Sequence, residues 1–188
     1  MVSGRYSKEY RLDVTDSPSG KKKTVLVYVG PYFDYDCTIQ EHSKQKRKIV
    51  GFGILSLALF ILGMSFYSNI SKAWYVAIPF AVNAFILFLY FESVFYFWPF
   101  KTKLNREQKD KGGERFKPIC LSSIFFYLIS LVGSSVKLMA LHTADAFDLI
   151  FLGCTVAEFV IMIYLFKLAL KIKYIECENP VAKDWEGK

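Results

Sequence analysis

The stretch that decides the fold is residues 49–67, IVGFGILSLALFILGMSFY, which contains no charged residue. The hydrocarbon core of a bilayer is about 30 Å thick, and an α-helix needs roughly 20 apolar residues to cross it. A backbone surrounded by lipid must also satisfy its own N–H and C=O groups, which a helix does within one segment. Residues 49–67 therefore predict a transmembrane helix.

Three further segments have the same length and character, at residues 73–97, 119–141 and 146–170. The charged positions inside these three segments are Glu92, Lys137, Asp148, Glu158 and Lys167. We therefore predict an all-α membrane protein, in which residues 49–170 form a four-transmembrane-helix bundle. A small cytoplasmic β-hairpin is expected before the bundle.

The positions of the charged residues along the chain support this prediction, whereas the overall composition does not distinguish it. The 188 residues are 53% apolar and 22% charged, with a net charge of +7, which is close to an average soluble domain. The charges, however, lie in blocks between the apolar segments. This pattern excludes a disordered chain, a disulfide-rich miniprotein and an ordinary soluble enzyme.

The distribution of Lys and Arg predicts the orientation. Of the 24 basic residues, ten precede the first span, seven lie between the second and third, and five lie at or beyond the end of the fourth. Cytoplasmic loops carry such an excess, so both termini are predicted to be cytoplasmic in a multi-pass integral membrane protein. The basic residues are expected to face anionic headgroups rather than nucleic acid.

The segments outside the spans have little predicted structure. Within residues 1–48, alternating Tyr10, Leu12 and Val14, a turn composition and a β-branched run predict a hairpin at about residues 9–29. Thr38 and Glu41 fit a capping box, so the first helix is expected to begin before the bilayer. His42 is expected to be solvated there. Residues 98–118 are expected to form a basic cytoplasmic loop, and residues 171–188 a cytoplasmic tail.

Four polar residues define a candidate intramembrane site. Counted at about 1.5 Å per residue from the outer ends of their helices, Asn83 lies about 15 Å deep and Glu158 about 18 Å deep. Ser56 and Ser130 fall near the same level. One interpretation is helix packing, with a protonated Glu158 bonded to Asn83 or a serine. The other is a proton- or cation-binding carboxylate on a transport route.

Two other groups of residues are predicted to meet near the membrane faces. Toward the outer face, Lys137 is expected to form a clasp with Asp145 and Asp148, which open the fourth helix. Toward the inner face, the sequence is rich in aromatic residues around an acidic one. This patch faces lipid, packs against a partner's helix or lines a site for a flat apolar molecule. Its members are Phe91, Glu92, Phe95 and Trp98.

The motifs that most enzymes require are absent from the sequence. Cys37 and His42 have no zinc-ligand spacing, no cofactor motif is present, and no cysteine belongs to a C-x-x-C pair. We expect a non-enzymatic membrane protein without metal or cofactor, serving as an accessory subunit that binds another membrane protein or itself. The alternative is a small homo-oligomeric transporter or channel in which Glu158 couples to a proton or cation.

The orientation can be tested by cysteine labelling in intact cells. An impermeant maleimide is expected to label a cysteine introduced at Asn69 or Thr143, because both positions lie in outer connectors. The native Cys37 and Cys177 should react only after the membrane is permeabilised. Labelling of Cys177 in intact cells would exclude cytoplasmic termini.

Overall fold

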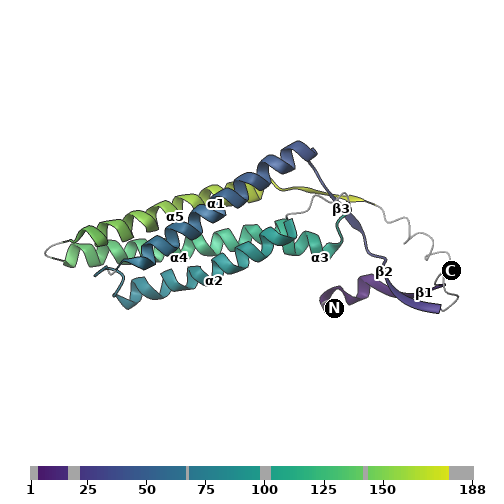
Figure 1. The fold of residues 1–188 in the computed structure, drawn as a ribbon, viewed down its shortest axis with the longest axis horizontal. Helices are drawn as coiled ribbons and strands as arrows, with labels where there is room; N and C mark the ends of the chain where they lie inside the picture. The colour runs from purple at the N-terminus through teal and green to yellow at the C-terminus, as the bar shows by residue number, and fades with distance from the viewer. Residues whose placement is uncertain (1–3, 17–21, 67, 98–102, 142–143, 178–188) are drawn as a thin grey trace.

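The computed structural model describes residues 4–16, 22–66, 68–97, 103–141 and 144–177, and most of them are helical (Figure 1). Each of the four long helices belongs to a helical run long and apolar enough to cross a membrane. This confirms the predicted number of candidate spans within the described residues. The long helices are α1 (Ile39–Ser65), α2 (Trp74–Phe97), α4 (Arg115–Ala140) and α5 (Ala146–Leu170).

The starts of α1 and α5 follow local sequence signals. The Thr38 side chain accepts a hydrogen bond from the Glu41 N–H, and the Glu41 carboxylate accepts one from the Thr38 N–H at 3.0 Å. This confirms the predicted capping box, so α1 begins well before its apolar stretch. Asp145 and Asp148 form an equivalent box at the start of α5.

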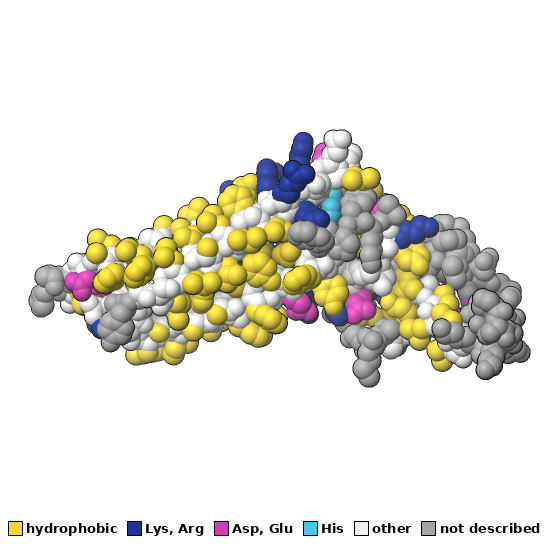
Figure 2. Space-filling model, viewed as in Figure 1, with side chains coloured by type: hydrophobic (Ala, Val, Ile, Leu, Met, Phe, Trp, Pro, Cys, Tyr) yellow, Lys and Arg dark blue, Asp and Glu magenta, His cyan; other side chains and the backbone are white. Residues whose placement is uncertain are grey.

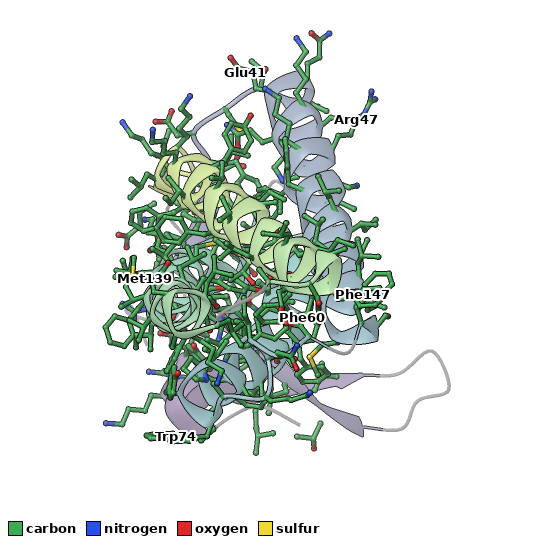
Figure 3. The ribbon with its side chains drawn as sticks, turned by 90° about the vertical axis from the view of Figure 1, so that its left-hand side faces the viewer. Glu41, Arg47, Phe60, Trp74, Met139 and Phe147 are labelled. Carbon is green, nitrogen blue, oxygen red and sulfur yellow. The ribbon has the colours of Figure 1, made fainter. Side chains whose placement is uncertain are left out.

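The four helices are arranged in the order α1, α5, α4, α2 around the bundle. The main contacts join α1 to α5, α5 to α4 and α4 to α2, whereas α1 touches α2 less extensively. Figure 3 looks along the bundle and shows Phe60 among the helices, with Trp74 and Met139 on the outer surface. Where α1 does meet α2, the ring of Phe60 stacks on that of Phe80 with centroids 4.8 Å apart.

The predicted N-terminal hairpin is present. After the 3-10 helix η1 (Gly4–Glu9), strand β1 (Tyr10–Asp16) pairs antiparallel with β2 (Lys22–Tyr28). Its base is attached to the start of helix α3 (Arg106–Lys109). Arg106 forms an ion pair with Glu9 at 2.8 Å, and the Asn105 side chain donates to the Tyr10 hydroxyl at 2.9 Å. Burial at this junction raises the pKa of Tyr28 to about 12.

A second sheet was not predicted. Strand β3 (Tyr32–Tyr35) pairs antiparallel with β4 (Tyr174–Cys177), and Phe33 also exchanges two backbone hydrogen bonds with Leu104, each 2.8 Å long. Three segments that are distant in the sequence therefore meet at one end of the bundle. Within the predicted tail at residues 171–188, residues 174–177 form a strand, which the sequence did not indicate. Both strands have only four residues, and β3 carries aromatic side chains on both faces, so neither shows the longer alternation that marks a half-buried strand.

The segment predicted as a basic loop is helical from Arg106 onward. Helix α3 has an Asn105–Gln108 capping box and continues through the π-helical turn η2 (Asp110–Glu114) into α4. Gly112 departs from helical geometry (φ −83°, ψ −112°) where η2 is buried beside the end of α2. Polar composition concealed this helix, because its stability comes from a cap and from ion pairs such as Lys111–Glu107.

His42 is buried, so the expectation of a solvated side chain is wrong. Its ring lies between the rings of Tyr35 and Phe97, with centroid distances of 4.5 and 4.7 Å. Strand β3 and the end of α2 supply these rings. One side of the first turn of α1 therefore packs against β3 and the end of α2, which the sequence pattern did not reveal.

The crossing of α1 and α2 depends on one glycine. A Cβ atom on Gly53 would lie 2.6 Å from the Tyr90 ring, whose hydroxyl donates to the Ile49 carbonyl at 2.7 Å. We expect Gly53→Ala to displace Tyr90 and reduce the free energy of unfolding by about 1–3 kcal/mol, measured by unfolding in mixed micelles. Gly51→Ala is the matched control, because a Cβ there contacts nothing within 4 Å. Equal stability of the two variants would contradict this packing.

Candidate functional site

A buried polar cluster lies inside the bundle, formed by Glu158 of α5, Tyr127 of α4 and Ser56 of α1. All three side chains are completely enclosed. The Tyr127 hydroxyl lies beside both the Glu158 carboxyl group and the Ser56 hydroxyl. None of these side-chain oxygens has a partner in standard hydrogen-bond geometry. We call these three residues the Glu158 cluster.

Helix α4 contributes Tyr127 to the cluster because its inward face carries polar residues. Its enclosed polar residues recur at intervals of three and four, which places them on one face of a helix. They are Ser123, Tyr127, Ser130 and Ser134. The opposite face of α4 is apolar and exposed, as Leu121, Phe125 and Leu128 show. The helix therefore turns its polar side toward its neighbours.

The predicted polar layer is divided between several contacts. Ser123 donates to the Asn83 side-chain oxygen at 2.8 Å, and the Asn83 amide donates to the Pro79 carbonyl at 3.2 Å. Ser130 donates to the Val76 carbonyl at 3.3 Å. Asn83 and Ser130 thus join α4 to α2. Of the four predicted residues, Ser56 and Glu158 share the cluster.

Sequence reasoning missed Tyr127 and Ser123. From sequence alone, a tyrosine in an aromatic-rich span is interpreted as an interfacial or lipid-facing residue. A single serine does not indicate which side of its helix faces the other helices. The signal that could have found them is the regular spacing of all four polar residues along one apolar helix. Such a stripe predicts the side that faces other helices.

The outer clasp has different partners from those predicted. Asp148 Oδ1 accepts hydrogen bonds from the Ser68 hydroxyl and the Asn69 N–H, both at 2.7 Å, and from the Ile70 N–H at 3.2 Å. Among the described ion pairs, none joins Lys137 to either acid. The acids bind the α1–α2 connector, because its tight turn presents several N–H groups to one carboxylate.

The inner patch is divided between two surfaces. Glu92 forms an ion pair with Arg115 at 3.0 Å, which links α2 to the start of α4. Phe95 is exposed on the outside of α2, whereas Phe91 is half-buried and lines a groove between α2 and α1. Trp98 lies outside the described residues.

The Glu158 cluster can hold or exchange a proton. A carboxyl group enclosed by apolar helices is costly to ionise, and the adjacent phenol and hydroxyl can each donate or accept a hydrogen bond. Within the described ranges, no three His, Cys, Asp or Glu residues are grouped closely enough to hold a metal ion. The carboxyl group and the two hydroxyl groups of the Glu158 cluster suit proton binding.

Comparisons with known proteins add no family to this description. No family model matches the chain, and neither the curated proteins nor the solved structures provide a match.

Proposed function

We propose that the chain is a non-enzymatic subunit of a larger membrane assembly. The observation that carries this proposal is an exposed stripe along α2. Its large apolar members recur at three- and four-residue steps or their sums, which is the spacing of a helix–helix seam. The members of this α2 stripe are Trp74, Ile78, Phe85, Phe88 and Phe95.

The side chains of the α2 stripe are larger than those on the exposed face of α4. On α4 the exposed large side chains are mostly aliphatic, as in Leu121, Leu128, Val132 and Val136, with Phe125 among them. Helices in a membrane associate by close packing rather than by a hydrophobic driving force. Four aromatic side chains and Ile78 on one side of α2 offer a large contact area for a partner's helix.

The hairpin offers a second surface to the same partner. Leu12 and Leu26 stand opposite each other across the two strands, and both are exposed. Among the described residues, β1 and β2 pair only with each other, so both edges can accept a further strand. The ion pair between Glu9 and Arg106 holds the hairpin beyond the end of the bundle (Figure 1).

The proposal includes cytoplasmic termini. Figure 2 shows apolar side chains along the bundle and basic side chains where the bundle meets the strands. Residues 44–48 at the start of α1 contribute four bases to this end. By the positive-inside rule, this concentration of bases supports a cytoplasmic position for this end, with the hairpin and β4 near anionic headgroups.

A photocrosslinking amino acid on the α2 stripe tests the proposal in native membranes. Benzoylphenylalanine at Phe88 is expected to give one discrete adduct with a different membrane protein, heavier than the 21.7 kDa chain. Phe125 on α4 is the matched control, since it is also an exposed phenylalanine of a long helix. It should yield no protein adduct.

The mass of the adduct distinguishes the outcomes. An adduct of twice the chain mass would replace the subunit proposal with self-association. Equal protein adducts from Phe88 and Phe125 would show that the α2 stripe is not a specific interface.

The alternative function is proton- or cation-coupled transport by a homo-oligomer. It is favoured by the Glu158 cluster, because three enclosed groups capable of proton exchange meet in one bundle. Four helices enclose little space, so this function also requires self-association. Under the subunit proposal the same three side chains serve only to pack α1, α4 and α5 together.

Substitution of Glu158 distinguishes the two functions. Under the subunit proposal, the Glu158→Gln variant is expected to have the wild-type free energy of unfolding and to give the same crosslinked adduct from position 88. Glutamine has the shape of glutamate and retains its hydrogen-bonding capacity. Glu158→Leu should lower stability by about 1 kcal/mol, the scale of a hydrogen bond between membrane helices. A proton flux into liposomes that wild-type protein supports and that folded Glu158→Gln lacks would establish the alternative. Glu92→Gln, at the exposed ion pair, is the control for that measurement.

A further inference from the structure

A charged recess lies where α4 leaves the basic end of the bundle. Its volume is about 620 Å³, and its walls are formed by η1, the end of α3, η2 and the first turn of α4. The charged side chains that line it are Lys109, Asp110, Lys111, Glu114 and Arg115. Bases and acids alternate in this recess, so it is not a simple anion site.

An apolar groove follows the recess along the outer face of α4. It has a volume of about 570 Å³ and includes Leu121, Ser122, Phe125 and Leu128. Pro118 lines the recess one turn before the groove begins. Pro118, Ser122 and Phe125 recur at steps of four and three, so recess and groove lie on the same face of the helix.

The length of this surface matches one leaflet of a bilayer. From Pro118 to Leu128 the helix rises about 15 Å, which is half of a hydrocarbon core about 30 Å thick. The recess then lies at headgroup level and the groove at the level of the acyl chains. We propose that α4 binds a phosphatidylethanolamine molecule, with its headgroup in the recess and one acyl chain in the groove.

The charges of the recess favour a zwitterionic headgroup with N–H donors. Arg115 and Lys111 can bind the phosphate, while Asp110 and Glu114 can accept hydrogen bonds from the primary ammonium. Two of the three bases already have an acidic neighbour, in the pairs Arg115–Glu92 at 3.0 Å and Lys111–Glu107 at 2.6 Å. The ammonium of the third, Lys109, lies 4.0 Å from the centroid of the Phe33 ring. A purely anionic headgroup would therefore meet carboxylates, and a choline headgroup would offer them no donor.

The ion pairs leave the recess open to such a ligand. The Arg115 side chain is 42% exposed in its pair with Glu92, and the Glu114 side chain is 38% exposed in its pair with Lys117. Asp110 accepts a hydrogen bond from Tyr6 at 3.0 Å, which holds η1 against the recess. This proposal concerns α4 and is independent of the partner expected at the α2 stripe.

Native mass spectrometry of the purified full-length chain in detergent tests the proposal. Phosphatidylethanolamine, phosphatidylcholine and phosphatidylglycerol with identical acyl chains are added separately and retention is compared. Ethanolamine lipid is expected to be retained about fivefold more than either of the others, the scale of one additional hydrogen bond. Glu114→Gln, which removes one of the two carboxylates, should reduce the preference over phosphatidylcholine. Ser122→Trp should block retention by filling the groove. Glu176→Gln, on an exposed carboxylate of β4, and Val156→Trp, on the exposed face of α5, are the matched controls outside the site.

Each other outcome overturns the proposal. Equal retention of the three lipids would show nonspecific annular contact. Tight binding of soluble phosphoethanolamine, unaffected by Ser122→Trp, would assign the recess to a free headgroup-like molecule rather than a lipid. If Glu114→Gln and Ser122→Trp keep wild-type melting temperatures and full ethanolamine preference, the lipid binds elsewhere.

Discussion

The bundle depends on the two-sided character of α4, whose inward face is polar and whose outward face is apolar. Lipid removes the hydrophobic force that would gather helices in water, so close packing and hydrogen bonds must hold them. Ser123 and Ser130 of α4 bond to α2, and Tyr127 meets Glu158 of α5 and Ser56 of α1. One helix thereby contacts the other three through polar groups. The same division leaves its apolar side for lipid.

Two different sets of contacts hold the helices together at the two ends of the bundle. At one end a single carboxylate, Asp148, gathers the hydroxyl and backbone N–H groups of the α1–α2 connector. At the other end a short strand, β3, lies between Leu104 and β4 and buries Phe33 and Tyr35. The Asp148 contacts fix the position of a few connector residues. The β3 contacts join the N-terminal segment, the region before α3 and the segment after α5 into one cap.

Features that depend on local sequence were predicted well. Length and apolarity identify the four long helices, the Thr38–Glu41 pair marks the start of α1, and alternation marks the hairpin. Features that depend on contacts distant in the sequence were not found. The β3–β4 pairing, the burial of His42 and the role of Tyr127 all depend on partners from other segments. No local sequence pattern shows which carboxylate will bind which N–H group. The sequence therefore predicted Lys137 as the partner of Asp148, whereas in the structure Asp148 binds the Ser68 hydroxyl and backbone N–H groups.

The pairing of β3 with β4 has a consequence for how the chain is made. Tyr35 and Tyr174 are partners in this sheet, yet nearly the whole membrane domain is synthesised between them. Contacts of such long range form late in folding, and β3 leaves the ribosome long before β4 exists. During translation, the edge of β3 that will receive β4 stays open, while the last span is still being inserted. The β3–β4 sheet can therefore form only after all four spans have been synthesised. A chain that ends before β4 keeps an unpaired strand edge at its surface.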